Sequence, residues 1–268
     1  MTAEKAQALV LRAIPFGETS AIVTLLTREQ GKLRGLAKGA WRPKSSFDAA
    51  LDLLSVCEVL VLRRAGGSLD LVTGAFLEQR FRVGRSQAAV AAGLYLAELL
   101  DAVTVDADPQ PGLFDLARTT VGLLSQPRPG SNQSTPVAAG DPAGVAALLL
   151  HTELGVLREL GQQPALHRCA ECGSLLAGPR IAFGLLAGGG LCPRCRRGQR
   201  LVVSVSAPAV GLLRQLATTP VATPPPDAVA LGEVRAVMNS LFNNLLGRRL
   251  KTSRWLQASL NPRPETRR

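Results

Sequence analysis

The cysteines of this sequence are arranged as a metal site. Four of the five form two Cys-x-x-Cys pairs, Cys169 with Cys172 and Cys192 with Cys195, and 19 residues separate the pairs. Two tight turns that each supply two thiolates complete the tetrahedral shell of one Zn²⁺ ion and leave no position for water. We therefore predict one zinc ion with a structural role. Redox-active or metal-free thiol pairs are the alternative at this stage.

A second group of residues has the chemistry of a phosphate-binding surface. In the stretch GKLRGLAKGAWRPKSSFDAAL (31–51), a strand over 32–38 would place its cations on one face and small apolar residues on the other. The loop that follows adds two cations and a tryptophan, whose ring can stack on a base. An ordinary solvated strand with a packed tryptophan is the alternative. The predicted surface comprises Lys32, Arg34, Lys38, Trp41, Arg42 and Lys44.

Arginines also surround the second cysteine pair. Arg194, Arg196, Arg197 and Arg200 could contact phosphates or could simply keep a small zinc module soluble, and the sequence favours neither reading. A further basic cluster near the end of the chain has a simpler interpretation, because cations are favourable at the end of a helix. That cluster comprises Arg248, Arg249, Lys251 and Arg254.

Nothing in the sequence indicates catalysis. His151 lies in an apolar helical pattern and His167 lies close to the cysteine pairs, and neither belongs to a recognisable nucleophile or acid–base group. No phosphate-binding or dinucleotide-binding glycine motif is present. The glycine run AGGGLC (187–192) is interpreted as a turn between the cysteine pairs, and Cys57 as a buried, inert side chain. We predict that the protein is not an enzyme.

The secondary structure predicted to position these residues changes along the chain, from strands in the first 80 or so residues to helices after them. Short Val-, Ile- and Leu-rich segments separated by turn-forming residues predict a small antiparallel β-barrel at the start of the chain. A long hairpin is expected around a Gly-Gly turn at 65–68. The predicted strands cover 7–14, 20–27, 32–38, 51–64 and 69–81.

Helices are predicted from residue 86 onward. Ser86 and the Asp141–Pro142 pair are good helix starts, and apolar residues recur at three- and four-residue steps in the last segment. A Pro/Gly/Ser-rich loop is expected at 127–142 and a Pro-rich link at 219–227. The predicted helices cover 86–103, 111–126, 143–161, 207–218 and 228–256.

The charge of the chain favours a polyanionic partner. The net charge is +11 and the isoelectric point is about 10.5. Residues 1–82 hold 12 Lys and Arg against 8 Asp and Glu, and residues 161–268 hold 15 against 4, whereas the segment between them is acidic. The longest apolar run is too short to span a bilayer, and the chain does not begin like a signal peptide. We expect a soluble, cytoplasmic protein without a membrane partner.

In this order the features resemble the RecO family, DNA repair proteins that act as mediators in bacterial recombination. GETSAIVTLLTREQGK (17–32) corresponds to a strand and its turn, and AKGAWRPKS (37–45) to a basic loop. The likeness is strong over residues 8–62 and at the four cysteines, which not every member keeps, and it is weak across 100–165.

The resemblance implies an α+β protein with an N-terminal OB-fold barrel (1–82), a helical domain (83–167 and 201–268) and an inserted four-cysteine zinc finger (168–200). It also implies binding of single- and double-stranded DNA, annealing of complementary strands and, with RecR and RecF, loading of RecA onto DNA coated by single-stranded DNA-binding protein. The protein would then be cytoplasmic and nucleoid-associated. The rival hypothesis is a zinc-ribbon protein that binds structured RNA.

Overall fold

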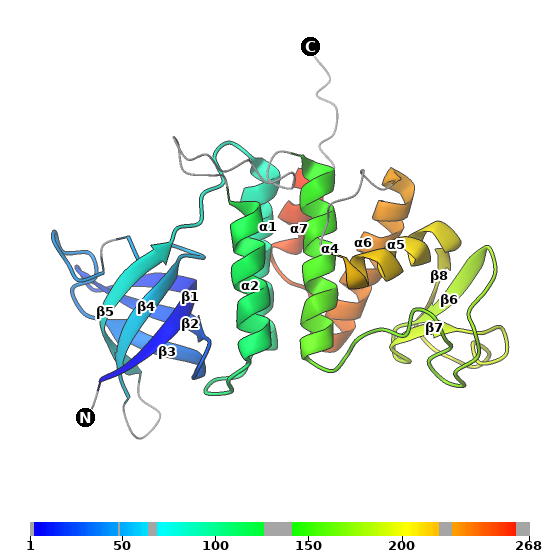
Figure 1. The fold of residues 1–268 in the computed structure, drawn as a ribbon, viewed down its shortest axis with the longest axis horizontal. Coiled ribbons are helices and arrows are strands. Elements are labelled where there is room, and N and C mark those ends of the chain that lie inside the picture. Colours follow the sequence, from blue (N-terminus) through cyan, green and yellow to red (C-terminus); the bar gives the residue numbers. More distant parts are fainter. Residues whose placement is uncertain (1–2, 48, 64–68, 126–140, 220–226, 261–268) are drawn as a thin grey trace, which may run out of the picture. The chain divides into compact units, whose positions relative to one another are not determined.

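The structure is a computed structural model that describes residues 3–47, 49–63, 69–125, 141–219 and 227–260 (Figure 1). The chain divides into two compact units, residues 1–134 and residues 135–268. The described part of the first unit holds a barrel of strands and two helices, and that of the second holds helices and a small sheet. The α+β class expected from the sequence is confirmed.

Five strands close the barrel of the first unit. Neighbouring strands follow the order β1-β2-β3-β5-β4, and every pair is antiparallel except β3 and β5, which run in the same direction. This is a five-stranded OB-fold barrel, so the fold implied by the resemblance is confirmed. The prediction of an entirely antiparallel barrel is wrong for one pair, because β3 and β5 are parallel. The strands are β1 (Ala3–Phe16), β2 (Ser20–Thr27), β3 (Gly31–Ala37), β4 (Val56–Leu62) and β5 (Asp70–Gln79).

Small and medium apolar side chains fill the barrel. In register across the first three strands, Val10 pairs with Leu25 and Leu25 with Leu33, and all three are buried in the barrel core. Burial of each such side chain contributes about 1.5–3 kcal/mol. The predicted strand at 51–64 is too long at its start, because residues 51–54 form a turn in which Leu54 has a φ of +57°.

Two helices cover part of the outer face of the barrel. Helix α1 (Gln87–Val103) begins at Ser86, whose side chain accepts a hydrogen bond from the N–H of Ala89, and α1 contacts β1 and β2. Helix α2 (Pro111–Leu124) contacts β2, and Asp115 on it forms an ion pair with Arg28 at 2.9 Å. Leu9 and Leu26, which face outward from the barrel, are therefore completely buried.

The segment after α1 fills a gap in the barrel wall. Strand β5 pairs only with residues 35–37 of β3, so the first half of β3 has a free edge. Asp106 forms a parallel bridge with Lys32 there, and the N–H of Ala107 donates to the carbonyl of Lys32 at 2.9 Å. The approach is so close that a Cβ on Gly31 would lie 2.4 Å from the backbone of Asp108.

Helices form the centre of the second unit. They are α4 (Pro142–Glu159), α5 (Ala207–Thr218), α6 (Ala228–Leu246) and α7 (Ser253–Leu260). Asp141 caps α4 as expected, accepting hydrogen bonds from the N–H groups of Ala143 and Gly144. Inside the unit, Glu153 of α4 and Arg235 of α6 form a buried ion pair. His151 donates through Nδ1 to the carbonyl of Leu216 at 2.7 Å, which gives that histidine a structural role.

The continuous helix predicted over 228–256 is wrong. Helix α6 ends at Leu246 because Gly247 adopts a left-handed conformation, with φ at +64°, and a separate helix begins at Ser253. Of the basic cluster expected at the end of one helix, Arg248, Arg249 and Lys251 follow α6 and Arg254 lies in the first turn of α7.

A small sheet replaces the turn predicted at the glycine run. Its strands are β6 (Arg180–Gly184), β7 (Gly189–Leu191) and β8 (Val202–Ser206), in the order β7-β6-β8. Gly188 forms the turn, with φ at +68°, and the glycines that follow enter β7. Gly189 is required there because a Cβ would lie 2.6 Å from the backbone of Ala165.

Three sequence predictions lie wholly or mostly outside the described residues. They are the Gly-Gly turn at 65–68, the Pro/Gly/Ser-rich loop at 127–142 and the Pro-rich link at 219–227. Within the described part of the chain, none of the helices combines the length and the hydropathy needed to cross a bilayer.

Candidate metal centre and nucleic-acid interface

The four cysteines of the two pairs come together in space. The Sγ atoms of Cys169, Cys172, Cys192 and Cys195 all lie within 4.8 Å of one another. Cys172 and Cys192, which belong to different pairs, have their Sγ atoms 3.8 Å apart. A tetrahedron of sulfurs with metal–sulfur distances of about 2.3 Å has edges of about 3.8 Å. The four cysteines are therefore spaced to hold one metal ion.

The two cysteine pairs lie on turns with the same backbone pattern. In the first turn the N–H of Gly173 donates to the carbonyl of Cys169 at 2.9 Å, and in the second the N–H of Arg196 donates to the carbonyl of Cys192 at 3.0 Å. Gly173, which closes the first turn, has a positive φ of +71°, whereas in the second segment the positive φ falls two residues later than the equivalent position, at Gly198. The repeated hydrogen bond shows that each pair of cysteines lies on a tight, closed turn.

Hydrogen bonds give the thiols unequal acidities. The backbone N–H of Cys195 lowers the pKa of Cys192 to about 6, and the hydroxyl of Ser174 lowers the pKa of Cys172. Hydrogen bonds with Cys172 and Cys192 raise the pKa of Cys195 to about 12. Four sulfurs this close cannot all carry a negative charge alone, but a divalent cation at their centre removes that repulsion. The donor set therefore fits a thiophilic metal.

The cysteine turns are attached firmly to the helices of the same unit. Arg214 on α5 donates two hydrogen bonds to the carbonyl of Leu166, at 3.0 and 2.8 Å, just before the first turn. Arg180 on β6 forms an ion pair with Glu233 on α6 at 3.5 Å. His167 precedes the first pair but is not part of the four-residue group, as expected from the sequence.

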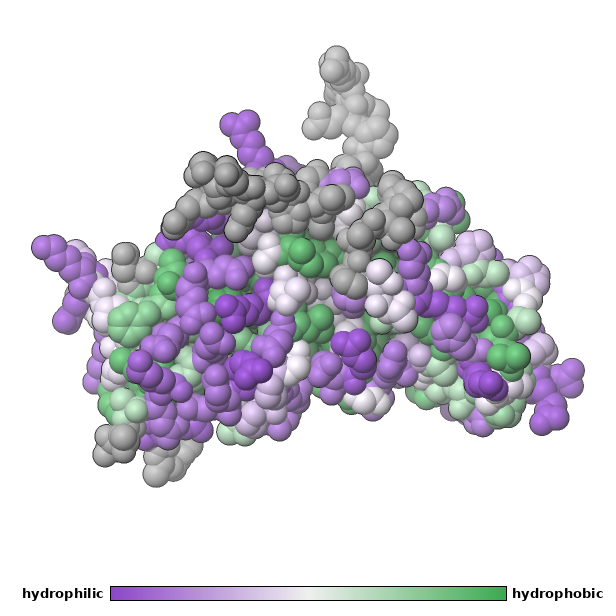
Figure 2. Space-filling view, in the orientation of Figure 1, coloured by the Kyte–Doolittle hydropathy of each residue, from purple (hydrophilic) through white to green (hydrophobic). Residues whose placement is uncertain are grey.

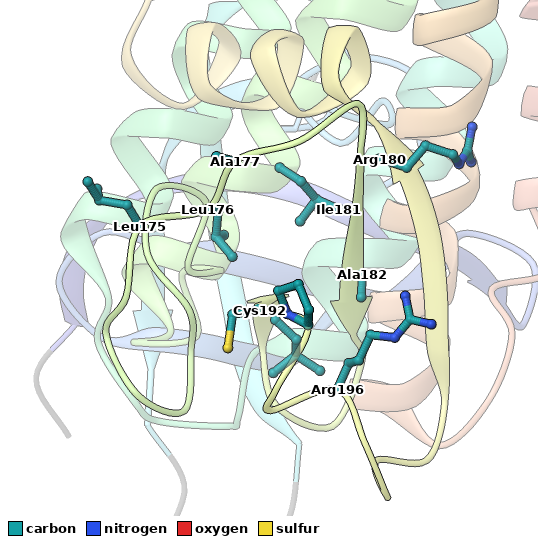
Figure 3. A pocket seen from close by; sticks show the side chains of 10 residues that line it. Leu175, Leu176, Ala177, Arg180, Ile181, Ala182, Cys192 and Arg196 are labelled. Carbon is teal, nitrogen blue, oxygen red and sulfur yellow. The ribbon is translucent and has the colours of Figure 1, made fainter.

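A pocket lies beside the second cysteine turn, and Cys192 is one of the residues that line it (Figure 3). Leu175, Leu176 and Ile181 form much of its apolar lining, and Arg180 and Arg196 also line it. Arg180 is occupied by hydrogen bonds to the hydroxyl and the carbonyl of Ser204 at 2.8 and 2.7 Å. Arg194 and Arg197, like Arg196, are exposed, so this turn presents three cations to solvent beside the metal site.

The basic stretch at 31–51 forms a strand and a pinned loop, largely as the alternation predicts. Arg34 and Lys38 are exposed, whereas Leu33 and Ala37 point into the barrel core. The loop is held against the β1–β2 turn, because the N–H of Trp41 donates to the carbonyl of Thr19 at 2.8 Å and the N–H of Gly39 donates to Ser20 Oγ at 3.3 Å.

The loop presents its polar side chains to solvent. Arg42 and Lys44 are exposed, and Trp41 is 46% exposed. Within the described ranges no ion pair involves Lys38, Arg42 or Lys44. These three cations are therefore available to an external anion.

Lys32 does not belong to this exposed surface, and the expectation that it would is wrong. Its side chain is only 6% exposed, and its Nζ forms an ion pair with Asp101 at 3.2 Å. Lys32 faces outward from the barrel as predicted, in register with the buried Leu26, but the end of α1 covers this part of the face. Arg34 is partly neutralised by Asp106 at 3.7 Å.

The sequence argument missed a cation on the neighbouring strand. Arg12 of β1 is exposed and lies in register with Thr24 of β2, which pairs with Arg34 of β3. The alternation of Arg12, Ile14 and Phe16 at the end of β1 is the signal that could have identified it. Cys57 is buried as predicted, and burial raises the pKa of its thiol to about 12, so it is unreactive.

Two family models match the chain almost from end to end. "Recombination protein O N terminal" matches residues 1–81, and "Recombination protein O C terminal" matches residues 86–254. The chain is 40% identical to the DNA repair protein RecO of Rhodopirellula baltica over 217 residues, which cover 80% of this chain and 74% of that protein. It is 32% identical to the DNA repair protein RecO of Anaeromyxobacter dehalogenans over 94% of this chain and 95% of that protein.

Proposed function

The chain belongs to the RecO family, whose role is in DNA repair and recombination, and we propose that it acts there as a non-catalytic mediator that binds DNA and anneals complementary strands. The observation that carries this proposal is the exposed, unneutralised cationic loop on the OB-fold barrel. Its cations come from a segment whose backbone is hydrogen-bonded to the β1–β2 turn, so the main chain that carries them is already in place before DNA arrives.

Annealing follows from simple electrostatics. Two complementary strands repel each other through their phosphates, and a surface of fixed cations lowers that repulsion while the strands search for their register. Release of counterions supplies affinity that does not depend on sequence. Phosphate contacts position a nucleic acid but carry no base information, so Lys38, Arg42 and Lys44 would recognise DNA of any sequence.

The partners that we propose follow from the family. RecR, and RecF with it, would act together with this protein, and the substrate would be single-stranded DNA covered by single-stranded DNA-binding protein. The outcome would be loading of RecA onto that strand. Such work takes place in the cytoplasm, at the nucleoid.

We propose that the four-cysteine site holds one Zn²⁺ ion. The geometry supports this assignment, since all four donors are cysteine sulfurs at the spacing of a tetrahedral site. When bound, the ion would supply folding energy to the two turns and no catalytic chemistry. Arg194, Arg196 and Arg197 on the second turn would then provide a second, auxiliary contact to phosphate.

The test is an annealing assay with complementary oligonucleotides of arbitrary sequence over a range of salt concentrations. We expect fast annealing that falls steeply as salt rises, and a large loss in the double variant Lys38→Ala, Arg42→Ala. Lys5→Ala is the control, because Lys5 is an exposed cation of the same barrel that is paired with Glu58. An annealing rate that does not change with salt concentration, or an equal loss of annealing in Lys5→Ala, would overturn the assignment of DNA binding to the basic loop.

A competition experiment addresses the rival function. Single-stranded DNA and RNA of equal length and matched sequence would be offered together. Equal binding or a preference for DNA agrees with the proposed function, whereas a clear preference for structured RNA would favour the zinc-ribbon alternative.

A further inference from the structure

The sulfurs of the cysteine site differ in how far solvent reaches them. Cys169 is only 3% exposed, whereas Cys172 is exposed, as are its neighbours from 170 to 175. Cys192 is half-buried and lines the pocket beside the second turn (Figure 3). In the space-filling view, the part of the molecule that holds β6, β7 and β8 carries hydrophilic side chains at its surface (Figure 2). A small water-soluble reagent can therefore reach Cys172 directly and Cys192 from the pocket.

The exposed thiol lies next to a thiol of the other turn. The Sγ atoms of Cys172 and Cys192 are 3.8 Å apart. A disulfide bond is about 2 Å long, so the two sulfurs need to approach each other by roughly 2 Å. Both turns lie at the surface, since residues 170–175 and 196–200 are exposed. A small shift of the two turns can therefore bring these sulfurs to bonding distance.

A bound metal ion would put these sulfurs in their reactive form. A thiol that coordinates a metal loses its proton, and the thiolate is the nucleophile that oxidants attack. Susceptibility to oxidation then follows exposure, which distinguishes Cys172 from the buried Cys169. Cys57, the fifth cysteine, is completely buried in the barrel core and would not react.

We propose that the cysteine site is also a site of reversible oxidation, in which hydrogen peroxide joins Cys172 to Cys192 in a disulfide and the metal ion is released. This inference rests on the proposed zinc assignment and adds to it a covalent reaction of two of the four ligands. The protein would then lose its metal under oxidising conditions and regain it under reducing ones.

The reaction is a two-electron oxidation. The sulfur of Cys172 attacks one oxygen of the peroxide, the O–O bond breaks, and hydroxide leaves, which gives a sulfenic acid. The thiolate of Cys192 then attacks that sulfur, the S–O bond breaks, and a second hydroxide leaves as the S–S bond forms. The two sulfurs together lose the two electrons that reduce the peroxide. Only two cysteine ligands remain, whereas a structural zinc site has four, so the site no longer holds its ion.

The anchors of the two turns support a reversible reaction. Arg214 holds the carbonyl of Leu166 just before the first turn. Strand β7, which ends one residue before Cys192, is paired with β6. Neither anchor involves a cysteine, and the new bond would join the two turns in place of the metal. The oxidised module would therefore stay assembled, and a dithiol could restore the two thiolates.

The test treats the full-length zinc-loaded protein with hydrogen peroxide and follows the released metal with a chromogenic chelator. We expect the release of one zinc ion per chain. Peptide mass spectrometry without reductant should then find the peptide that contains Cys172 joined to the peptide that contains Cys192. Dithiothreitol should break that bond, after which added zinc should bind again.

Two histidine variants separate the role of Cys172 from that of the site as a whole. Cys172→His and Cys195→His both leave three cysteines and one histidine, a set of ligands that binds zinc. Cys195→His keeps both thiols of the proposed disulfide, so peroxide should release its zinc about as fast as that of the wild type. Cys172→His lacks the exposed thiol and should release its zinc several-fold more slowly.

Three outcomes would overturn the proposal. They are retention of zinc by the peroxide-treated wild type, a disulfide within one turn (Cys169 with Cys172, or Cys192 with Cys195), and equal rates of release in the two variants. The mapping uses the wild-type protein, so it decides between these bonds even where a variant fails to bind zinc. Failure of the zinc assignment is distinguishable, because the untreated protein would then contain no zinc.

Discussion

Lys32 donates two hydrogen bonds to Asp101, one to its backbone oxygen at 2.7 Å and one to its carboxylate at 3.2 Å, and so fastens strand β3 to the last turn of helix α1. Lys32→Met should lower the free energy of unfolding by about 2 kcal/mol, because a charge-assisted contact in a buried position is lost. Urea denaturation measures this. Lys38→Met, at an exposed position of the same face, should change stability little but weaken DNA binding; the reverse pattern would contradict the roles given to these lysines.

The close contact at Gly31 gives a second prediction. Gly31→Ala should destabilise the first unit by about 3 kcal/mol or more, since the new Cβ meets the backbone of Asp108 and φ is +73°. Gly17→Ala is the control, because φ is similar at +64° but nothing lies within 4 Å. That variant should cost only about 1 kcal/mol. Equal thermal midpoints for the two variants would show that the segment after α1 does not close the barrel wall.

The ion pair between Arg28 and Asp115 predicts a pH dependence. A side-chain hydrogen bond from Arg28 holds the pKa of Asp115 below its usual value, which is about 4. The lowered pKa means that the stabilisation is complete above about pH 4 and is lost as pH falls through the folded-state value. The stability difference between wild type and Arg28→Gln should therefore be constant near neutral pH and shrink in acid. A difference that grows in acid would refute the prediction.

The metal site gives a prediction that combines stoichiometry and stability. Cys172→Ser should abolish the binding of one zinc ion per chain and lower the thermal midpoint, because metal binding is coupled to folding of the two turns. Metal content is measured by atomic absorption or with a chromogenic chelator. Cys57→Ala is the control and should keep one zinc, since Cys57 belongs to the barrel core of the first unit and is not one of the four clustered cysteines. Retention of zinc by Cys172→Ser would disprove the ligand set.

The metal site could be predicted from the sequence, whereas the cover of the basic strand could not. The Cys-x-x-Cys spacing can be recognised within four residues, and two such pairs in one chain are typical of a tetrahedral zinc site. Alternation likewise gave the correct faces of β3, because side chains of a strand alternate whatever it packs against. Lys32 is buried because its side chain contacts Asp101, which lies 69 residues further along the chain. No local sequence pattern predicts that contact.

The errors in the secondary structure have similar causes. The glycine run at 187–192 looks like a turn, but Gly189 enters a strand because the backbone of Ala165 lies against it. The apolar period of the last helical pattern ends at Leu245, before Gly247, so it supports α6 alone, and the prediction was wrong in extending one helix on to residue 256. A glycine followed by two arginines was the local signal for a helix end.

The burial of Leu9 and Leu26 beneath α1 and α2 determines where the barrel can be separated from the rest of the chain without exposing its apolar surface. The boundary between the two family models falls between residues 81 and 86, after the last barrel strand. A barrel excised at that boundary would expose those two leucines and leave the charge of Lys32 without its carboxylate. The barrel and its two helices therefore form one structural unit. A chimaera in which the barrel is exchanged between relatives should fold stably only when α1 and α2 are exchanged together with it.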